Sequence, residues 1–120
     1  MKYPWLDEYC LSKVGARKDY KLEWEATRYL LGDKMFAMIG ANKEGKAIFT
    51  FKLEPNHGQL MRAQYAGDIT AGYYMNKDHW NSMLLDGSVP DDVVRDLVDS
   101  AYRVLLESLP QKVQKELTGS

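Results

Sequence analysis

The sequence predicts an α+β fold, with an antiparallel β-sheet packed against an N-terminal helix and a long C-terminal helix. Three observations predict it. Apolar and polar residues alternate with the period of a strand in short segments between residues 20 and 53 and at 80 to 85, tight turns join these segments, and apolar residues recur at helical spacing before and after them. The 120 residues fit a single domain, 1–120.

A short helix is predicted at residues 4 to 13. Pro4 suits a first helical turn and Gly15 is placed to stop the helix. Between them lie apolar residues at helical spacing: Trp5, Leu6, Tyr9 and Cys10. Cys10 is the single cysteine, so it forms no intramolecular disulfide, and its apolar neighbours predict a buried thiol rather than a nucleophile.

The next segments predict an antiparallel meander. Tyr20, Leu22, Trp24 and Ala26 alternate with charged residues, which predicts a strand with one buried face and places Trp24 in the core. Residues 29–31 and 35–39 flank Gly32-Asp33, a pair suited to a hairpin turn. A further turn at residues 42–45 leads into a strand that ends near residue 53.

The second half begins with an interruption at residues 55–58, followed by a short predicted helix at 60–64. Residues 67–76 look irregular, which leaves Tyr73 and Tyr74 free for contact, and a strand is predicted at 80–85. Ser88 is expected to cap a long helix that ends before Pro110, because apolar residues from Val94 onward share one face. A last short helix is predicted at 111–117.

Composition limits the possible functions. The longest apolar runs are shorter than the roughly 20 residues needed to cross a bilayer, and acidic residues near the N-terminus argue against a secretory signal, so we expect a cytoplasmic protein without membrane association. The net charge of −1 and pI of 6.1 are unlike those of a strong nonspecific nucleic-acid binder. The charge is nevertheless uneven, with a basic cluster at Lys13, Arg17, Lys18 and Lys21.

No motif predicts catalysis or a bound metal. Residues 40–47 have the glycine and lysine spacing of a phosphate-binding loop, but Ala47 lacks the required hydroxyl and a strand pattern follows, so a hairpin is the better interpretation. His57 and His79 lie at no metal-ligand spacing. The sequence therefore predicts no catalytic residue, metal ligand or cofactor.

Residues 74–81, with the sequence YMNKDHWN, concentrate polar groups before a predicted strand. If Trp80 faces inward, strand alternation turns His79 and Asn81 outward, with Lys77 on the same side, where they are suited to phosphates or base edges. The alternative is that Asn76 stabilises the turn and His79 bonds a neighbouring carbonyl.

Four strings carry a family resemblance: EYCLSKVGA, DKMFAMIG, YMNKDHWNSMLLDGSVPDD and LVDSAYRVLLESLP. In this order they resemble the MmcQ/YjbR family of small bacterial proteins. The resemblance implies a YjbR/CyaY-like fold, similar to bacterial frataxin and to double-wing DNA-binding domains. The family motif falls on Asn76, Lys77, His79 and Trp80, and a second pattern on Lys13, Gly15 and Ala16, where Val14 replaces the usual proline.

Together these observations favour a non-enzymatic DNA-binding or regulatory protein. Its expected phosphate and polar contacts are Lys13, Arg17, Lys18, Lys21, Lys77 and His79. The alternative is a frataxin-like metal-handling or protein-interaction domain, suggested by the resemblance and by the carboxylates of one predicted helix: Asp91, Asp92, Asp96 and Asp99. A third class, an enzyme, would need a deep pocket that joins His79 to a carboxylate.

Overall fold

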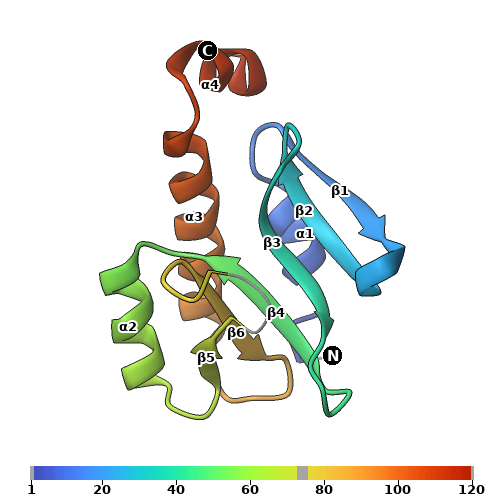
Figure 1. Cartoon of the computed structure of the whole chain (residues 1–120), viewed down its shortest axis with the longest axis vertical. Helices are drawn as coiled ribbons and strands as arrows, with labels where there is room; N and C mark the ends of the chain where they lie inside the picture. The colour runs from blue at the N-terminus through green and yellow to red at the C-terminus, as the bar shows by residue number, and fades with distance from the viewer. Residues whose placement is uncertain (1, 73–75, 120) are drawn as a thin grey trace.

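A twisted antiparallel sheet forms the centre of the computed structural model, which describes residues 2–72 and 76–119 (Figure 1). The strand order in the sheet is β1-β2-β3-β4-β6-β5, and every neighbouring pair is antiparallel. The strands of the described residues are β1 Ala16–Lys21, β2 Ala26–Leu31, β3 Lys34–Ala41, β4 Ala47–Lys52, β5 Ile69–Ala71 and β6 Trp80–Leu84.

Helices cover one face of this sheet. They are α1 Leu6–Leu11, α2 Pro55–Gln64, α3 Asp91–Ser108 and α4 Gln111–Thr118. In Figure 1, α1 and α3 lie behind the strands, α2 lies beside β5, and α4 extends past the upper end of the sheet. This arrangement confirms the predicted α+β class with an antiparallel sheet, an N-terminal helix and a long C-terminal helix.

Strand alternation gives the sheet two different faces. We call the covered side the helix-backed face; its residues are fully buried and include Tyr29, Ala37, Phe49, Phe51 and Met83. We call the other side the open face; the register places Arg28, Met38, Thr50, Ser82 and Thr70 in one row across it. The hydrophobic core therefore lies between one face of the sheet and the helices.

The predicted strand through Trp24 is wrong. β1 ends at Lys21, a 3₁₀ turn η1 spans Leu22–Trp24, and Glu25 takes a left-handed backbone conformation (φ 50°) before β2 begins. Because this turn breaks the alternation, Leu22 and Trp24 project from the sheet and remain 73% and 48% exposed. Trp24 is thus a surface residue, contrary to the core position expected from period two.

Other boundaries also differ from prediction. α1 is shorter than the predicted 4–13, α2 already begins at Pro55, and β5 forms within a segment that looked irregular. Ser88 does not cap α3: its backbone N–H and hydroxyl both donate to Asp68, and the residue before α3 is Pro90. Tyr73 and Tyr74 lie outside the described residues.

The two ends of the chain pack against each other. The Tyr3 hydroxyl donates to the Val89 carbonyl at 2.7 Å, and Lys13 forms an ion pair with Asp99 of α3. Gly15 has φ +81°, and a Cβ there would come within 2.6 Å of the Leu117 carbonyl oxygen, so a side chain would displace α4. No helix within residues 2–72 and 76–119 is long and apolar enough to cross a membrane.

Candidate functional site

Two members of the predicted basic cluster are held by helix carboxylates. Lys13 pairs with Asp99, and Lys18 Nζ lies 3.1 Å from Asp7 of α1. Burial works against the charged form of Lys13, but the hydrogen bond and the charge of Asp99 outweigh it and raise the pKa of Lys13. These two lysines therefore lie on the helix side of the molecule, where their charge is matched.

The other two members, Arg17 and Lys21, lie on the open face. Strand alternation separates them from Lys18, because residues 17, 19 and 21 share one side of β1. Beside them Arg28 binds Asp19 through two hydrogen bonds of 2.8 and 2.6 Å, and the Arg28 hydrogen bond lowers the pKa of Asp19. The predicted cluster is thus divided between two faces.

Trp24 stands next to these open-face cations. Lys21 Nζ lies 5.3 Å from the centroid of the indole ring, and the Arg28 guanidinium carbon lies 5.8 Å from it. Lys21 also lies 3.7 Å from Glu23, and Lys52 shares the open face because it is paired with Trp80 and alternates with buried Phe51. An exposed indole and several cations therefore share one surface.

The motif residues Asn76, Lys77, His79 and Trp80 form the approach to β6. The Asn76 side chain accepts a hydrogen bond from the Asp78 N–H at 2.9 Å, and the Asn76 carbonyl accepts one from the Trp80 N–H at 2.9 Å. Asn76 therefore stabilises the turn, as the structural interpretation of the motif predicts. Lys77 is exposed and His79 is half-buried.

The expected orientation within β6 is reversed. Asn81 is fully buried on the helix-backed face, where it accepts a hydrogen bond from Arg62 and donates to the His79 carbonyl at 3.3 Å. Trp80 is half-buried and lies on the open face. Asn81 therefore does not join Lys77 and His79 in an outward row, because the core accommodates a polar residue that Arg62 satisfies.

β1 and the approach to β6 are far apart in the sheet. Four inter-strand steps separate β1 from β6 in the strand order, which corresponds to about 19 Å at about 4.8 Å per step. Arg17 and Lys21 thus do not contact the motif residues directly. What joins these regions is the surface of the open face between them.

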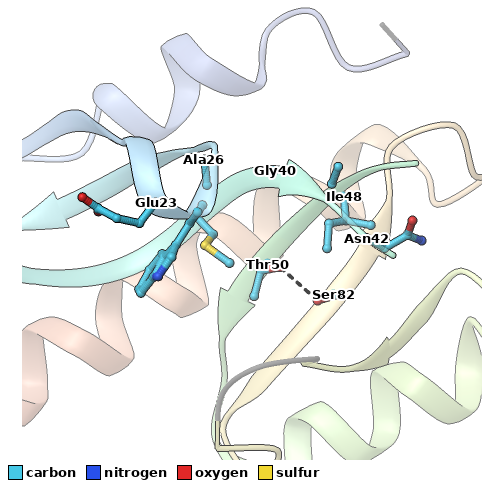
Figure 2. A pocket seen from close by; sticks show the side chains of 10 residues that line it. Glu23, Ala26, Gly40, Asn42, Ile48, Thr50 and Ser82 are labelled. Atoms are coloured by element: carbon cyan, nitrogen blue, oxygen red, sulfur yellow. Dashed lines mark hydrogen bonds between the residues drawn. The ribbon is translucent and has the colours of Figure 1, made fainter. Parts of the chain in front are cut away.

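A hollow of about 570 Å³ occupies this surface, and Figure 2 shows its lining. Its residues come from η1 and from strands β2, β3, β4 and β6: Glu23, Trp24, Ala26, Met38, Gly40, Ala41, Asn42, Ile48, Thr50 and Ser82. The floor is low where Ala26 faces Gly40, since a Cβ on Gly40 would come within 3.3 Å of the Ala26 Cβ. Small residues between larger ones therefore create the hollow.

Thr50 and Ser82 supply polar groups to this lining. Their hydroxyl oxygens lie 2.9 Å apart on neighbouring strands and form a hydrogen bond (Figure 2). A hydroxyl is both a donor and an acceptor, so the pair retains hydrogen-bonding capacity after this mutual bond. A second hollow of about 270 Å³ shares Asn42, Ile48 and Ser82 with the first and extends toward Thr70 of β5. The two hollows form a groove that crosses the strands.

Other candidate chemistry has structural explanations. Cys10 is fully buried, and burial raises the pKa of its thiol to about 12, so it is not an activated nucleophile. In α3, Asp99 binds Lys13 and the Tyr9 hydroxyl, and Asp91 accepts a hydrogen bond from the Trp5 indole. Within the described part of the chain, no group of three His, Cys, Asp or Glu residues is arranged to hold a metal ion.

Fold and groove define the class of protein: a small α+β protein whose antiparallel sheet is covered by helices on one side and open on the other. Residues 11–104 match the YjbR family model, and the chain belongs to the YjbR family. It is 34% identical over 110 residues to a protein of Escherichia coli K12 that carries the name "Uncharacterized protein YjbR", a match covering 92% of each chain. It is 27% identical over 89 residues to YbdF of Escherichia coli O157:H7, covering 74% of this chain and 71% of YbdF.

Solved structures share the fold. A Deinococcus radiodurans protein, DR2400, with a DUF419 domain, superimposes with a TM-score of 0.81 at 23% identity, covering 93% of this chain and 84% of that chain. A protein from Pseudomonas syringae superimposes with a TM-score of 0.70 at 20% identity, covering 87% and 98% respectively. These likenesses show the architecture, so a function has to be argued from the open face itself.

Proposed function

We propose that this protein is a non-enzymatic, cytoplasmic nucleic-acid-binding protein that receives a single strand on the open face of its sheet. The observation that carries the proposal is the groove beside exposed Trp24, with Arg17, Lys21, Arg28 and Lys52 on the same face. Of the residues predicted from sequence, Arg17 and Lys21 belong to this surface.

The physical reason is that single strands expose both their bases and their phosphates. Proteins that bind them combine aromatic side chains, on which bases stack, with cations that meet the backbone, and an uncovered β-sheet is one established platform for this. Trp24 supplies the aromatic ring and Lys21 and Arg28 lie within 6 Å of its centroid. Stacking and phosphate contact are thus available at one place.

Charge distribution supports the same side of the molecule. α3 carries a predominance of carboxylates and packs on the helix-backed face, away from the groove. The open face carries Arg17, Lys21, Arg28 and Lys52, with Asp19 and Glu23 against them. This small excess of positive charge predicts moderate affinity that falls with salt, with a slope of log K against log salt of about −1 to −2 for two cations in contact with a single strand.

The test is a fluorescence-anisotropy titration with a labelled oligothymidine of about ten residues at low salt, repeated at rising salt. We expect binding that weakens along this slope. The double substitution Arg17→Glu with Lys21→Glu should abolish most of it, whereas Lys112→Glu with Lys115→Glu, the same change of charge on exposed α4, should leave it. Absence of a complex at low salt, or equal loss in both variants, contradicts the proposal.

Duplex DNA of matched length is the comparison ligand. Paired bases are stacked inside the duplex and are not available to Trp24, so we expect the duplex to bind more weakly than the single strand. A clear preference for the duplex would instead return attention to contacts made by Lys77 and His79 at the β6 end of the sheet.

A further inference from the structure

We infer that the hollow beside Trp24 is a pocket for one unstacked nucleobase, and that it is the position where the bound strand is held most firmly. This inference rests on the proposed function and deepens it, because it names the part of the ligand that enters the pocket and the residues that hold it. Those residues are Trp24, Ile48 and Met38 around the base, with Thr50 and Ser82 at its edge.

The shape of the hollow suits a flat ligand. Its volume of about 570 Å³ lies within the range of roughly 300 to 1,000 Å³ typical of small-ligand pockets, so it has room for a base with its sugar. Ala26 and Gly40 lower the floor, and the close approach of Gly40 to the Ala26 Cβ, 3.3 Å for an added Cβ, leaves little room for a larger residue at either position. A planar ring can therefore enter between Trp24 and the side chain of Ile48.

The lining combines apolar contact with adaptable polar groups. Trp24, Met38 and Ile48 offer carbon and sulfur surface to the faces of a base, which is the part that every base shares. The hydroxyls of Thr50 and Ser82 are nine-tenths or more buried and lie on the lining. Because a hydroxyl pairs with donors and acceptors alike, this pocket should accept a base while discriminating little among base types.

The surroundings give the backbone of the strand a place to lie. Lys21 and Arg28 lie against the Trp24 indole, so the phosphates next to a base held there meet positive charge. The second hollow continues from Asn42, Ile48 and Ser82 toward Thr70, which provides a path for the neighbouring nucleotides across β4, β6 and β5. One base is thus held deeply and the rest of the strand follows a shallower groove.

The experiment compares an oligothymidine with an abasic oligomer of the same length and charge. We expect the base-bearing strand to bind about five- to one hundred-fold more tightly, the range that stacking of a single base supplies. It should also quench tryptophan fluorescence, and the variant Trp24→Phe assigns that signal, since Trp5 and Trp80 remain. Trp24→Ala should bring the base-bearing strand down to the affinity of the abasic one.

Two further variants isolate the pocket. Thr50→Val combined with Ser82→Ala removes both hydroxyls together, which keeps the fold because neither partner is left unsatisfied, and should weaken only the base-bearing strand. Leu60→Ala removes an equally exposed apolar side chain from α2 and should change neither affinity. Thermal melting of each variant checks that it is folded.

The outcomes separate the two proposals. Equal, salt-dependent binding of the abasic and the base-bearing strands overturns the pocket and leaves the proposed function in place. Binding of neither strand overturns the proposed function, and the pocket falls with it. A base preference that survives Trp24→Ala and the hydroxyl variant places the base elsewhere and also overturns the inference.

Discussion

The two faces of the sheet are made by the same strands, yet they differ in almost every property. On the helix-backed face, Phe49 and Phe51 stack with centroids 5.4 Å apart and are fully buried beneath helices. On the open face, the residues between them in β4 are Ile48, Thr50 and Lys52, which surround a hollow or face solvent. One face is filled and the other is left unfilled.

This difference separates stability from recognition within a single strand. Substitutions on the helix-backed face remove packed surface and should change the free energy of unfolding. Substitutions on the open face remove groups that the fold does not need and should change binding instead. Four substitutions test this division, in order of expected effect on stability.

Phe51→Ala should have the largest effect. It removes a fully buried aromatic ring at the centre of the core and should lower the free energy of unfolding by about 3–5 kcal/mol. Urea denaturation followed by circular dichroism measures the loss. The matched control Leu60→Ala, at a position 59% exposed, should change it by less than about 0.5 kcal/mol. A loss below about 1 kcal/mol for Phe51→Ala would mean that the helix-backed face is not the core.

Arg62→Met should have an intermediate effect. The substitution removes the donor that satisfies the buried Asn81 side chain, and an unsatisfied buried acceptor costs about 1–3 kcal/mol. Adding Asn81→Leu should recover part of that loss, because the polar group is then gone as well. Chemical denaturation of both single variants and the double variant measures the coupling. Strict additivity would show that the two residues do not interact.

Asp7→Asn should have a smaller effect that depends on pH. Burial raises the pKa of Asp7, but hydrogen bonds from Tyr29 and Lys18 outweigh it and lower the pKa below its usual value. A carboxyl whose pKa is lower in the folded state contributes stability that is present above about pH 4 and is lost as pH falls through the folded pKa. The variant should therefore be less stable at neutral pH and show a shallower loss in acid.

Unfolding midpoints measured from neutral pH into acid test this expectation. Glu8→Gln, an exposed carboxyl on the same helix, is the control and should keep the acid dependence of the parent protein. If Asp7→Asn keeps the full acid dependence as well, the contact between α1 and Tyr29 is not what acid disrupts.

Thr50→Val combined with Ser82→Ala should have the smallest effect. Replacing both partners of a hydrogen bond by apolar groups of similar shape is nearly neutral, so we expect a change below about 1 kcal/mol. Differential scanning calorimetry gives the comparison with Phe51→Ala on the opposite face. A loss as large as that of Phe51→Ala would show that the open face is also structural, and would remove the division between the faces.

Sequence reasoning recovers the elements whose side chains alternate between the core and the open face. The strand ending near residue 53 and the long helix through Val94 and Leu105 are correctly predicted, because burial imposes period two on the first and a single apolar stripe on the second. The hairpin turns at Gly32 and Gly45 are also correct. Family membership is confirmed through the same local strings.

The groove is harder to predict, since it depends on departures from these periods. Leu22 and Trp24 continue the alternation of a strand, but the left-handed Glu25 ends it, and nothing in their apolar character distinguishes exposed from buried residues. β5 is three residues long, too short to show a period. The division of the basic cluster was within reach, because period two applied to residues 16–21 separates Lys18 from Arg17 and Lys21.

The packing of the two ends of the chain also sets the order in which the protein is completed on the ribosome. The middle strands contact neighbours that are close in sequence and can pair early, whereas α1 and β1 find Val89, Asp99 and Leu117 only after α3 and α4 have been synthesised. During synthesis the first residues therefore wait as an unfinished edge. We expect this late closure to be the slow step of folding, and substitutions at Gly15 to delay it.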